Sequence, residues 1–133
     1  MTALESCTRR HKALASPARL RILAMLDSGE LCACQLIAVL GLAPSTVSRH
    51  VAELRAAGLL TERKDGRWVH YALAASADID AVLEPIRSGL RDDPQIRRDR
   101  EEVERIRRVA VEVLCEAGRD LARLTEMRKV LDG

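Results

Sequence analysis

The sequence has no phenylalanine, and tryptophan and tyrosine each occur once in its 133 residues. A hydrophobic core must therefore be built from Leu, Ile, Val and Ala. Surfaces that hold single-stranded nucleic acid by base stacking need several exposed aromatic side chains. The composition therefore argues against that class of binding protein.

Long apolar segments are also missing. No run approaches the roughly 18 apolar residues of a membrane-spanning helix, and the N-terminus lacks the apolar core of a signal peptide. We therefore expect a cytoplasmic protein with no membrane partner. In that compartment its four cysteines are predicted to be free thiols, open to metals or oxidants, and not structural disulfides.

Length and charge set the next limits. At 133 residues the chain can form one domain with a sizeable core but not a multi-domain enzyme. Residues 1–74 carry ten Lys and Arg against six Asp and Glu, whereas residues 75–133 carry twelve against fourteen. The mild basic excess of the first part fits a nucleic-acid partner and, equally well, an ordinary solvated surface.

Two short helices separated by a glycine turn are predicted in the first half of the chain. Gly41 ends the first of them, Pro44 opens the second, and Gly58 ends it. The inward-facing residues of the second helix are Val47, Val51 and Leu54. This arrangement is typical of a helix-turn-helix.

A β-hairpin is predicted directly after these helices. Residues 59–64 and 67–73 are β-prone, and Asp65-Gly66 between them is a strong two-residue turn signal. A hairpin in this place is a wing. The predicted fold class is mainly α with a small β-hairpin wing, a winged helix-turn-helix.

The last third of the chain is highly charged. Residues 78–90 predict a helix, which Asp92-Asp93-Pro94 brings to an end. From Glu101 onward a seven-residue apolar repeat predicts one helix, packed either against a second subunit or back onto its own domain. Its positions are Val103, Ile106, Ala110, Val113, Ala117, Leu124, Met127 and Leu131. We therefore predict a domain over residues 1–92 and a charged helical extension, for dimerisation or an accessory role, over residues 93–133.

Cys32 and Cys34 lie where the first helix of the pair should begin. On a regular helix, residues two apart point about 200° away from each other, so their sulfurs could not share one ion. Cys32 escapes this limit if it occupies the N-cap position. The helix N-terminus should also lower the thiol pKa values and prepare both cysteines to bind soft ions.

The sequence resembles the ArsR/SmtB family of winged-helix metalloregulatory repressors. Three segments carry the resemblance: Glu-Leu-Cys-x-Cys at residues 30–34, Ser-Thr-Val-Ser-Arg-His at 45–50 and Gly-Arg-Trp-Val-His-Tyr at 66–71. It implies a homodimer, formed through its N- and C-terminal helices, that binds operator DNA and is released when a metal binds. Within the family, this cysteine pattern is similar to that of arsenite and antimonite sensors and of cadmium and lead sensors.

The sequence also departs from the family in three places. Many arsenite sensors have a third cysteine where this chain has Ile37, and Ala43 stands where the family usually has a serine cap. The family's zinc site on a late helix needs histidines, and no histidine follows His70. A zinc site of that kind is therefore disfavoured.

Arsenite prefers three sulfur ligands, and Cys32 and Cys34 supply two. Cys7 lies on an apolar stripe expected to face the dimer interface, from which it could reach the partner's pair. Cys115 and an exogenous ligand are the alternatives. The predicted metal ligands are thus Cys32, Cys34 and, as third ligand, Cys7.

The second helix of a helix-turn-helix enters the major groove by its N-terminal end, so its outward side chains should read base edges and nearby phosphates. The predicted residues are Ser45, Thr46, Ser48 and Arg49. His50 either touches phosphate or is a structural histidine. In the wing, Arg63, Lys64 and Arg67 should contact the DNA backbone or the minor groove.

The sequence therefore predicts a repressor that binds double-stranded operator DNA and is released by trivalent arsenic or antimony. The alternatives are a sensor of cadmium, lead or zinc, or a thiol redox sensor with the same cysteines. A module that only dimerises is a third option. An enzyme is not expected, because there is no Cys-x-x-Cys motif and no general base is identifiable near Cys32.

Overall fold

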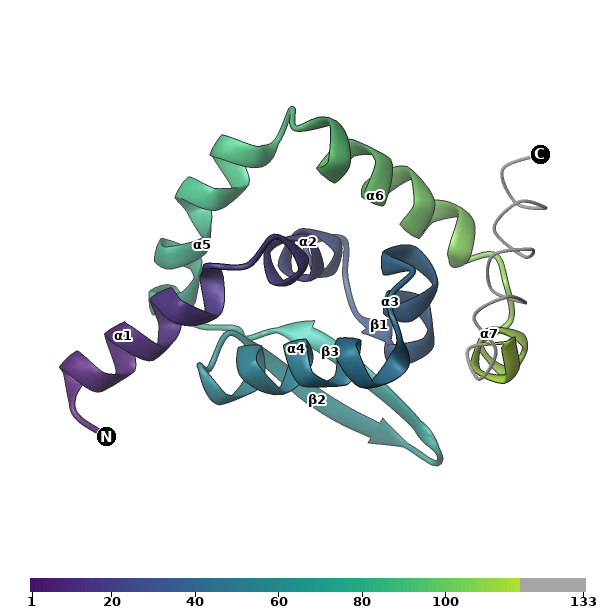
Figure 1. The fold of residues 1–133 in the computed structure, drawn as a ribbon, viewed down its shortest axis with the longest axis horizontal. Coiled ribbons are helices and arrows are strands. Elements are labelled where there is room, and N and C mark those ends of the chain that lie inside the picture. Colours follow the sequence, from purple (N-terminus) through teal and green to yellow (C-terminus); the bar gives the residue numbers. More distant parts are fainter. Residues whose placement is uncertain (118–133) are drawn as a thin grey trace.

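The computed structural model describes residues 1–117 and folds them into a helical body with a small antiparallel sheet (Figure 1). In chain order the elements are α1 (Ala3–Leu14), α2 (Pro17–Leu26), β1 (Leu31–Cys32), α3 (Ala33–Leu40), α4 (Pro44–Ala56), β2 (Leu60–Asp65), β3 (Trp68–Leu73), α5 (Ala77–Leu90), α6 (Pro94–Ile106) and α7 (Val111–Ala117). No helix in this part of the chain has the length and apolar character needed to cross a membrane.

Helices α3 and α4 form the predicted helix-turn-helix. Gly41 ends α3 in the left-handed conformation, with φ 67° and ψ 21°, which a residue without Cβ adopts at little cost. Pro44 occupies the first turn of α4, where its missing N–H is not needed. Ala43 is the N-cap of α4 and provides no side-chain cap, because alanine has no side-chain acceptor. The inward-facing residues predicted for α4 are buried: Val47, Val51 and Leu54.

The wing is also present, but it belongs to a sheet of three strands in the order β1-β3-β2. Asp65 pairs with Trp68, so the two loop residues are Gly66 and Arg67, one position later than predicted. The φ of Gly66 is +61°, a value that the first loop position of a type II′ turn requires. The two-residue strand β1 was not predicted, because it is too short to show an alternating pattern.

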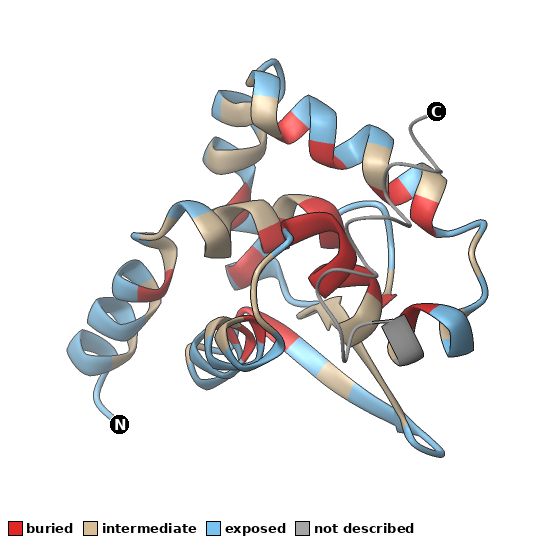
Figure 2. Cartoon of the chain, turned by 45° about the vertical axis from the view of Figure 1, so that its right-hand side comes forward, coloured by how far each residue is buried: buried red, intermediate tan, exposed pale blue. Residues whose placement is uncertain are grey.

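The core is aliphatic, as the lack of phenylalanine predicted. About half of its buried side chains come from α2, α3 and α4, and the buried residues gather in the middle of the molecule (Figure 2). They include Ile22, Leu36, Val39, Val47, Leu54 and Leu59. Cys32 is buried with them and is only 1% exposed. The start of α3 is therefore fixed within the best-packed part of the protein.

The charged C-terminal segment differs from the single helix predicted from its seven-residue repeat. A turn between Ile106 and Val111 separates α6 from α7. Helix α6 packs against α2 and α3, and α7 packs against α3. Val103 and Ile106 are each 1% exposed, so these repeat positions face the core of the same chain. Leu124, Met127 and Leu131 lie outside the described residues, and dimerisation through this segment stays a prediction.

A buried ion pair fixes α6 to α2. Arg21 donates from Nε to Oδ2 of Asp99 at 2.8 Å and from Nη2 to Oδ1 at 2.9 Å. Gln95 donates a further hydrogen bond of 2.9 Å to Oδ1 of Asp99. The hydrogen bonds to Asp99 raise the pKa of Arg21. The paired geometry explains how a carboxylate can lie 4% exposed in a helical interface.

Candidate metal centre and nucleic-acid interface

Cys32 occupies the N-cap of α3, as the spacing of the two cysteines predicted. Its φ of −82° and ψ of 161° are extended, so its side chain is free of the helical direction that Cys34 follows. The backbone N–H of Cys32 donates a hydrogen bond of 2.8 Å to Oε1 of Gln35. This bond fixes the backbone that carries the Cys32 sulfur.

Three cysteine sulfurs converge at this helix end. The Sγ atoms of Cys32, Cys34 and Cys115 all lie within 4.8 Å of one another. A bond between a soft metal and sulfur is about 2.3 Å, so three sulfurs arranged evenly around one ion are at most about 4.0 Å apart. Only a small movement would therefore bring three reduced thiols onto one ion.

Two of these cysteines are joined. Cys34 and Cys115 form a disulfide across 81 positions of sequence, and Cys7 and Cys32 are the free cysteines. The prediction of four free thiols was therefore wrong. The turn after α6 is the physical cause, because it returns α7 to the side of α3 and brings Cys115 to Cys34. Reduction of this bond would restore a cluster of three thiols.

The expected lowering of the Cys32 pKa was also wrong. Burial raises the pKa of the Cys32 thiol, and hydrogen bonds from the backbone at Gln35 and Cys34 oppose this effect only in part. Desolvation of the thiolate therefore outweighs the helix N-terminus.

A cleft of about 510 Å³ opens onto the sulfurs. The wing forms part of its wall through Arg67, Trp68 and Val69, and Glu112 of α7 lies at its edge. The Arg67 guanidinium stacks on the Trp68 ring at 4.6 Å from the ring centre. An ion could thus reach the sulfurs from solvent. An occupant would also touch the wing.

Cys7 lies elsewhere on this chain. It is exposed on α1, with its Sγ 3.6 Å from Nδ1 of His11, and it is not in the three-cysteine cluster. Its predicted role required the Cys32–Cys34 pair of a second subunit. That role stays a prediction.

The side chains predicted to read DNA lie at the N-terminal end of α4. Ser45, Ser48 and Arg49 are exposed, and Thr46 is half-buried. Helix α4 contacts β2 of the wing, so the two candidate DNA-contacting elements are neighbours. Their roles in base and phosphate contacts stay predictions.

His50, the fifth predicted residue of α4, holds a structural contact. Arg19 donates from Nη1 to Nδ1 of His50 at 3.2 Å, and Arg19 Nε also donates to the backbone oxygen of Ala13 at 2.7 Å. Burial, together with the charges of Arg19 and Arg49, lowers the pKa of His50. Arginine has no acceptor, so Nδ1 must accept and the proton of neutral His50 lies on Nε2. The remaining N–H could still donate to a phosphate.

The three basic residues of the wing have different surroundings. Arg63 donates to both carboxylate oxygens of Glu30, at 3.1 Å and 2.6 Å. This bidentate pair raises the pKa of Arg63 and lowers that of Glu30. Lys64 and Arg67 are exposed and have no acidic partner among residues 1–117. They are thus better placed than Arg63 to bind phosphate.

Comparison with known proteins shows which family has this architecture. Residues 16–62 match the family described as "Bacterial regulatory protein, arsR family". The solved structure of HlyU from Vibrio cholerae N16961 is 35% identical in sequence, with a TM-score of 0.59, and the match covers 66% of this chain and 96% of HlyU. The chain belongs to the ArsR family.

Two further relatives give this ArsR-family protein a context. The arsenical resistance operon repressor of Escherichia coli (strain K12) is 48% identical over 64 residues, which cover 47% of this chain and 55% of the relative. The homodimeric winged helix-turn-helix DNA-binding domain of Mb0332 from Mycobacterium bovis has a TM-score of 0.60 at 27% identity, covering 67% of this chain and 82% of that one. The match to the curated E. coli repressor thus spans only about half of its length.

The family match also locates what sequence reasoning missed. Cys32 and Cys34 lie inside the matched stretch, whereas Cys115 and the cleft residues Trp68 and Glu112 lie beyond it. Spacing could not have linked Cys115 to Cys34, because the contact depends on the turn between α6 and α7. The seven-residue repeat gave no help, because it placed Val113 on the buried side, whereas Val113 is 47% exposed and Leu114 is buried.

Proposed function

We propose that this ArsR-family protein is a repressor that binds operator DNA as a homodimer in the cytoplasm and is released by a trivalent metalloid, arsenite or antimonite, bound to its cysteines. The convergence of the Cys32, Cys34 and Cys115 sulfurs within 4.8 Å at the start of the helix-turn-helix carries this proposal. The arsenical resistance repressor among the relatives supports it.

Three thiols suit trivalent arsenic. Arsenite is As(OH)₃ at neutral pH, and each thiol that binds replaces one hydroxide, so three S–H and three As–OH groups give three As–S bonds and three waters. The metalloid carries no positive charge that must be balanced in the buried site. The raised pKa of Cys32 is compatible with this exchange, because the thiol proton leaves in the water formed.

We assign Cys115 as the third ligand in place of Cys7. Cys115 already lies beside the other two sulfurs, whereas Cys7 is exposed on α1 and would need the pair of a partner subunit. Cadmium or lead could use the same sulfurs, because soft thiolate ligands select for all of these ions.

DNA release would follow from the position of the site. In the reduced protein, metalloid binding would link Cys32 at the N-cap of α3 to Cys115 of α7, beside the cleft wall formed by Arg67 and Trp68. A coupling free energy of about 1 to 3 kcal/mol between the two sites would weaken DNA binding by about 5- to 150-fold.

The test is a fluorescence-anisotropy titration of the reduced full-length protein on DNA from upstream of its own gene, with and without arsenite, antimonite, Cd²⁺ and Pb²⁺. Arsenite should release the wild type, and Cys34→Ser should remain on DNA. Cys115→Ser should lose most of the response, whereas Cys7→Ser should keep it. If Cys7→Ser alone abolishes release, the third ligand comes from a partner subunit. If arsenite releases every variant from DNA as readily as the wild type, the sulfur site is not the sensor.

A thiol redox sensor is a second candidate, favoured by the Cys34–Cys115 disulfide. A peroxide would oxidise the two thiols to the disulfide, and its two oxygen atoms would leave as two waters. Peroxide should then change operator affinity in the wild type and not in Cys115→Ser. Release by arsenite without any response to peroxide would exclude this candidate.

A further inference from the structure

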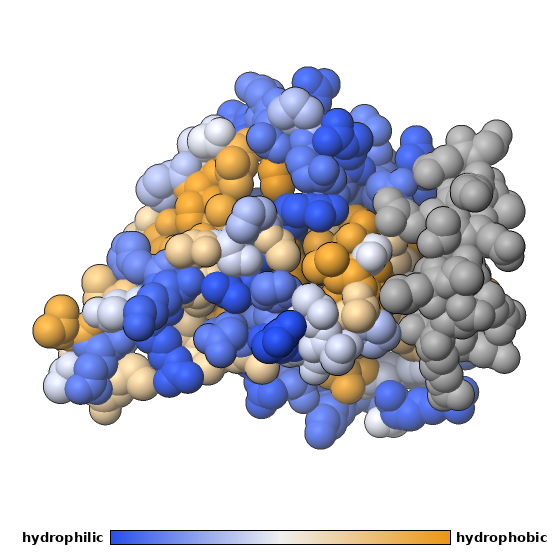
Figure 3. Space-filling view, viewed as in Figure 1, coloured by the Kyte–Doolittle hydropathy of each residue, from blue (hydrophilic) through white to orange (hydrophobic). Residues whose placement is uncertain are grey.

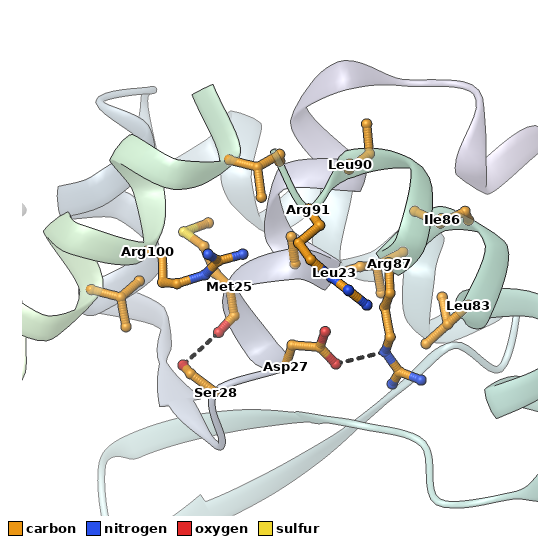
Figure 4. Close-up of a pocket in the computed structure, with 13 residues that line it drawn as sticks. Leu23, Met25, Asp27, Ser28, Leu83, Ile86, Arg87, Leu90, Arg91 and Arg100 are labelled. Carbon is orange, nitrogen blue, oxygen red and sulfur yellow. Dashed lines mark hydrogen bonds and ion pairs between the residues drawn. The ribbon is translucent and has the colours of Figure 1, made fainter. Parts of the chain in front are cut away.

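A second cavity lies on the other side of α2 from the helix-turn-helix. It has a volume of about 250 Å³, is open to solvent on one side, and is lined by residues of α2, α5 and α6 (Figure 4). Its inner wall is apolar: Leu23, Met25, Leu83, Ile96 and Val103. All five are almost fully packed, so the apolar surface open to a ligand belongs mainly to the half-buried Ile86 and Leu90. It has no residue in common with the sulfur cleft.

The entrance to this cavity is basic. Arg87 is neutralised by Asp27, to which it donates at 2.8 Å, and by Asp80 and Glu84 at 3.8 Å. Arg91 and Arg100 also line the cavity, and neither has an acidic partner within 4 Å among residues 1–117. Figure 4 shows their side chains extending over the cavity from opposite sides. Two guanidinium groups thus lie unneutralised above an apolar interior.

On the face drawn in Figure 3, hydrophobic residues gather over α5 and hydrophilic residues cover α6. A ligand that fits must have an apolar part for the interior and a negative group for the two arginines. For scale, an engineered apolar cavity of about 150 Å³ binds benzene. A cavity of about 250 Å³ therefore accommodates a short alkyl chain or one ring.

We propose that the cavity between α2, α5 and α6 is a binding site for an amphipathic organic anion, namely a short carboxylic acid. The apolar part lies against Ile86, Leu90 and Ile96, and the carboxylate accepts hydrogen bonds from Arg91 and Arg100. Helix α2 also contacts α4, so the ligand would bind one helix away from the candidate DNA-reading surface. The proposal does not depend on metalloid binding.

The test is a methyl-NMR titration of the reduced full-length protein with three probes: hexanoate, hexan-1-ol and acetate. Hexanoate should shift the methyl signals of Leu83 and Ile86 saturably and leave those of Val47 and Val51 unchanged. Hexan-1-ol has the same chain without the charge, and it should bind about tenfold more weakly because it lacks the charge-assisted hydrogen bonds. Acetate has the charge without the chain and should not bind measurably.

Arginine variants locate the charge. Arg100→Gln should weaken hexanoate about fivefold to tenfold and leave hexan-1-ol unchanged, since only the carboxylate contacts Arg100. Arg97→Gln is the matched control, because Arg97 is exposed on the same helix and does not line the cavity. Equal binding of hexanoate and hexan-1-ol, or equal losses in the two variants, would overturn the assignment of an anion. Absence of saturable shifts at Leu83 and Ile86 would overturn the site itself.

Discussion

Replacing Asp99 by asparagine should destabilise the protein strongly, because Asp99 joins α6 to α2 through a bidentate contact. The substitution preserves volume but removes the negative charge and turns an amide N–H₂ toward the donors of Arg21. Loss of one partner from a buried pair typically costs about 3–5 kcal/mol. The Arg21 side chain remains 23% exposed and can be rehydrated in part, whereas Asp99 is 4% exposed. We therefore expect a loss of about 2–3 kcal/mol, equivalent to a fall in Tm of roughly 8–12 °C.

Urea unfolding of the reduced protein, followed by far-ultraviolet circular dichroism, measures this loss. Glu101→Gln is a suitable control, since it removes an exposed carboxylate from the same helix and should change stability by less than about 0.5 kcal/mol. The double variant Arg21→Met/Asp99→Leu should recover most of the loss, because an apolar pair leaves no buried charge unmatched. The reasoning would be refuted if Asp99→Asn behaved like Glu101→Gln, or if the double variant lost the sum of both single changes.

Three further predictions concern the candidate sites. In reduced protein near pH 7, iodoacetamide should modify Cys32 far more slowly than the exposed Cys7, because burial raises the Cys32 pKa and keeps the thiol protonated. Mass spectrometry can follow both reactions, and equal rates would contradict this prediction. The His50 pKa is lowered on folding, so the unfolded state binds the proton more readily and wild-type stability should fall as pH drops through about 6.5. Urea unfolding at pH 7.5 and 5.5 measures this loss of stability, and the loss should be smaller in His50→Gln. Arg67→Ala should weaken binding to all DNA sequences alike and lower the salt slope by about one unit, and a change in sequence preference would count against a backbone contact.

The sequence predicted most of the fold because strong local signals determine it. Pro44 and the two glycines Gly41 and Gly58 delimit α4, and the turn around Gly66 delimits the hairpin. The N-cap position of Cys32 followed from the same kind of reasoning, since two cysteines at this spacing cannot converge within a regular helix. Signals of this kind act over a few residues and are visible in the chain itself.

Contacts between distant segments could not be predicted in this way. The repeat from Glu101 onward holds at Val103 and Ile106, but it cannot show that the helix breaks after Ile106 and turns back toward α3. Beyond the break, the repeat position Val113 is exposed. That break decides where Cys115 lies, and hence the composition of the sulfur cluster. Burial of Cys32 likewise depends on packing against residues far away in sequence, which is why its pKa was expected to move in the wrong direction.

The packing around the sulfurs indicates how a bound metalloid would act on DNA. Helix α3 is held in the core by side chains such as Leu36, which is fully buried, so it resists displacement. Strand β3 pairs with β1, and His70 of β3 lies opposite Cys32. All residues of β3 are only half-buried. Movement of Cys32 should therefore pass mainly to the wing and not to α4. If so, metalloid-bound protein should keep its preference for the operator but lose wing contacts, and its residual DNA binding should show the reduced salt slope of Arg67→Ala. Loss of operator preference with an unchanged salt slope would place the movement in α4 instead.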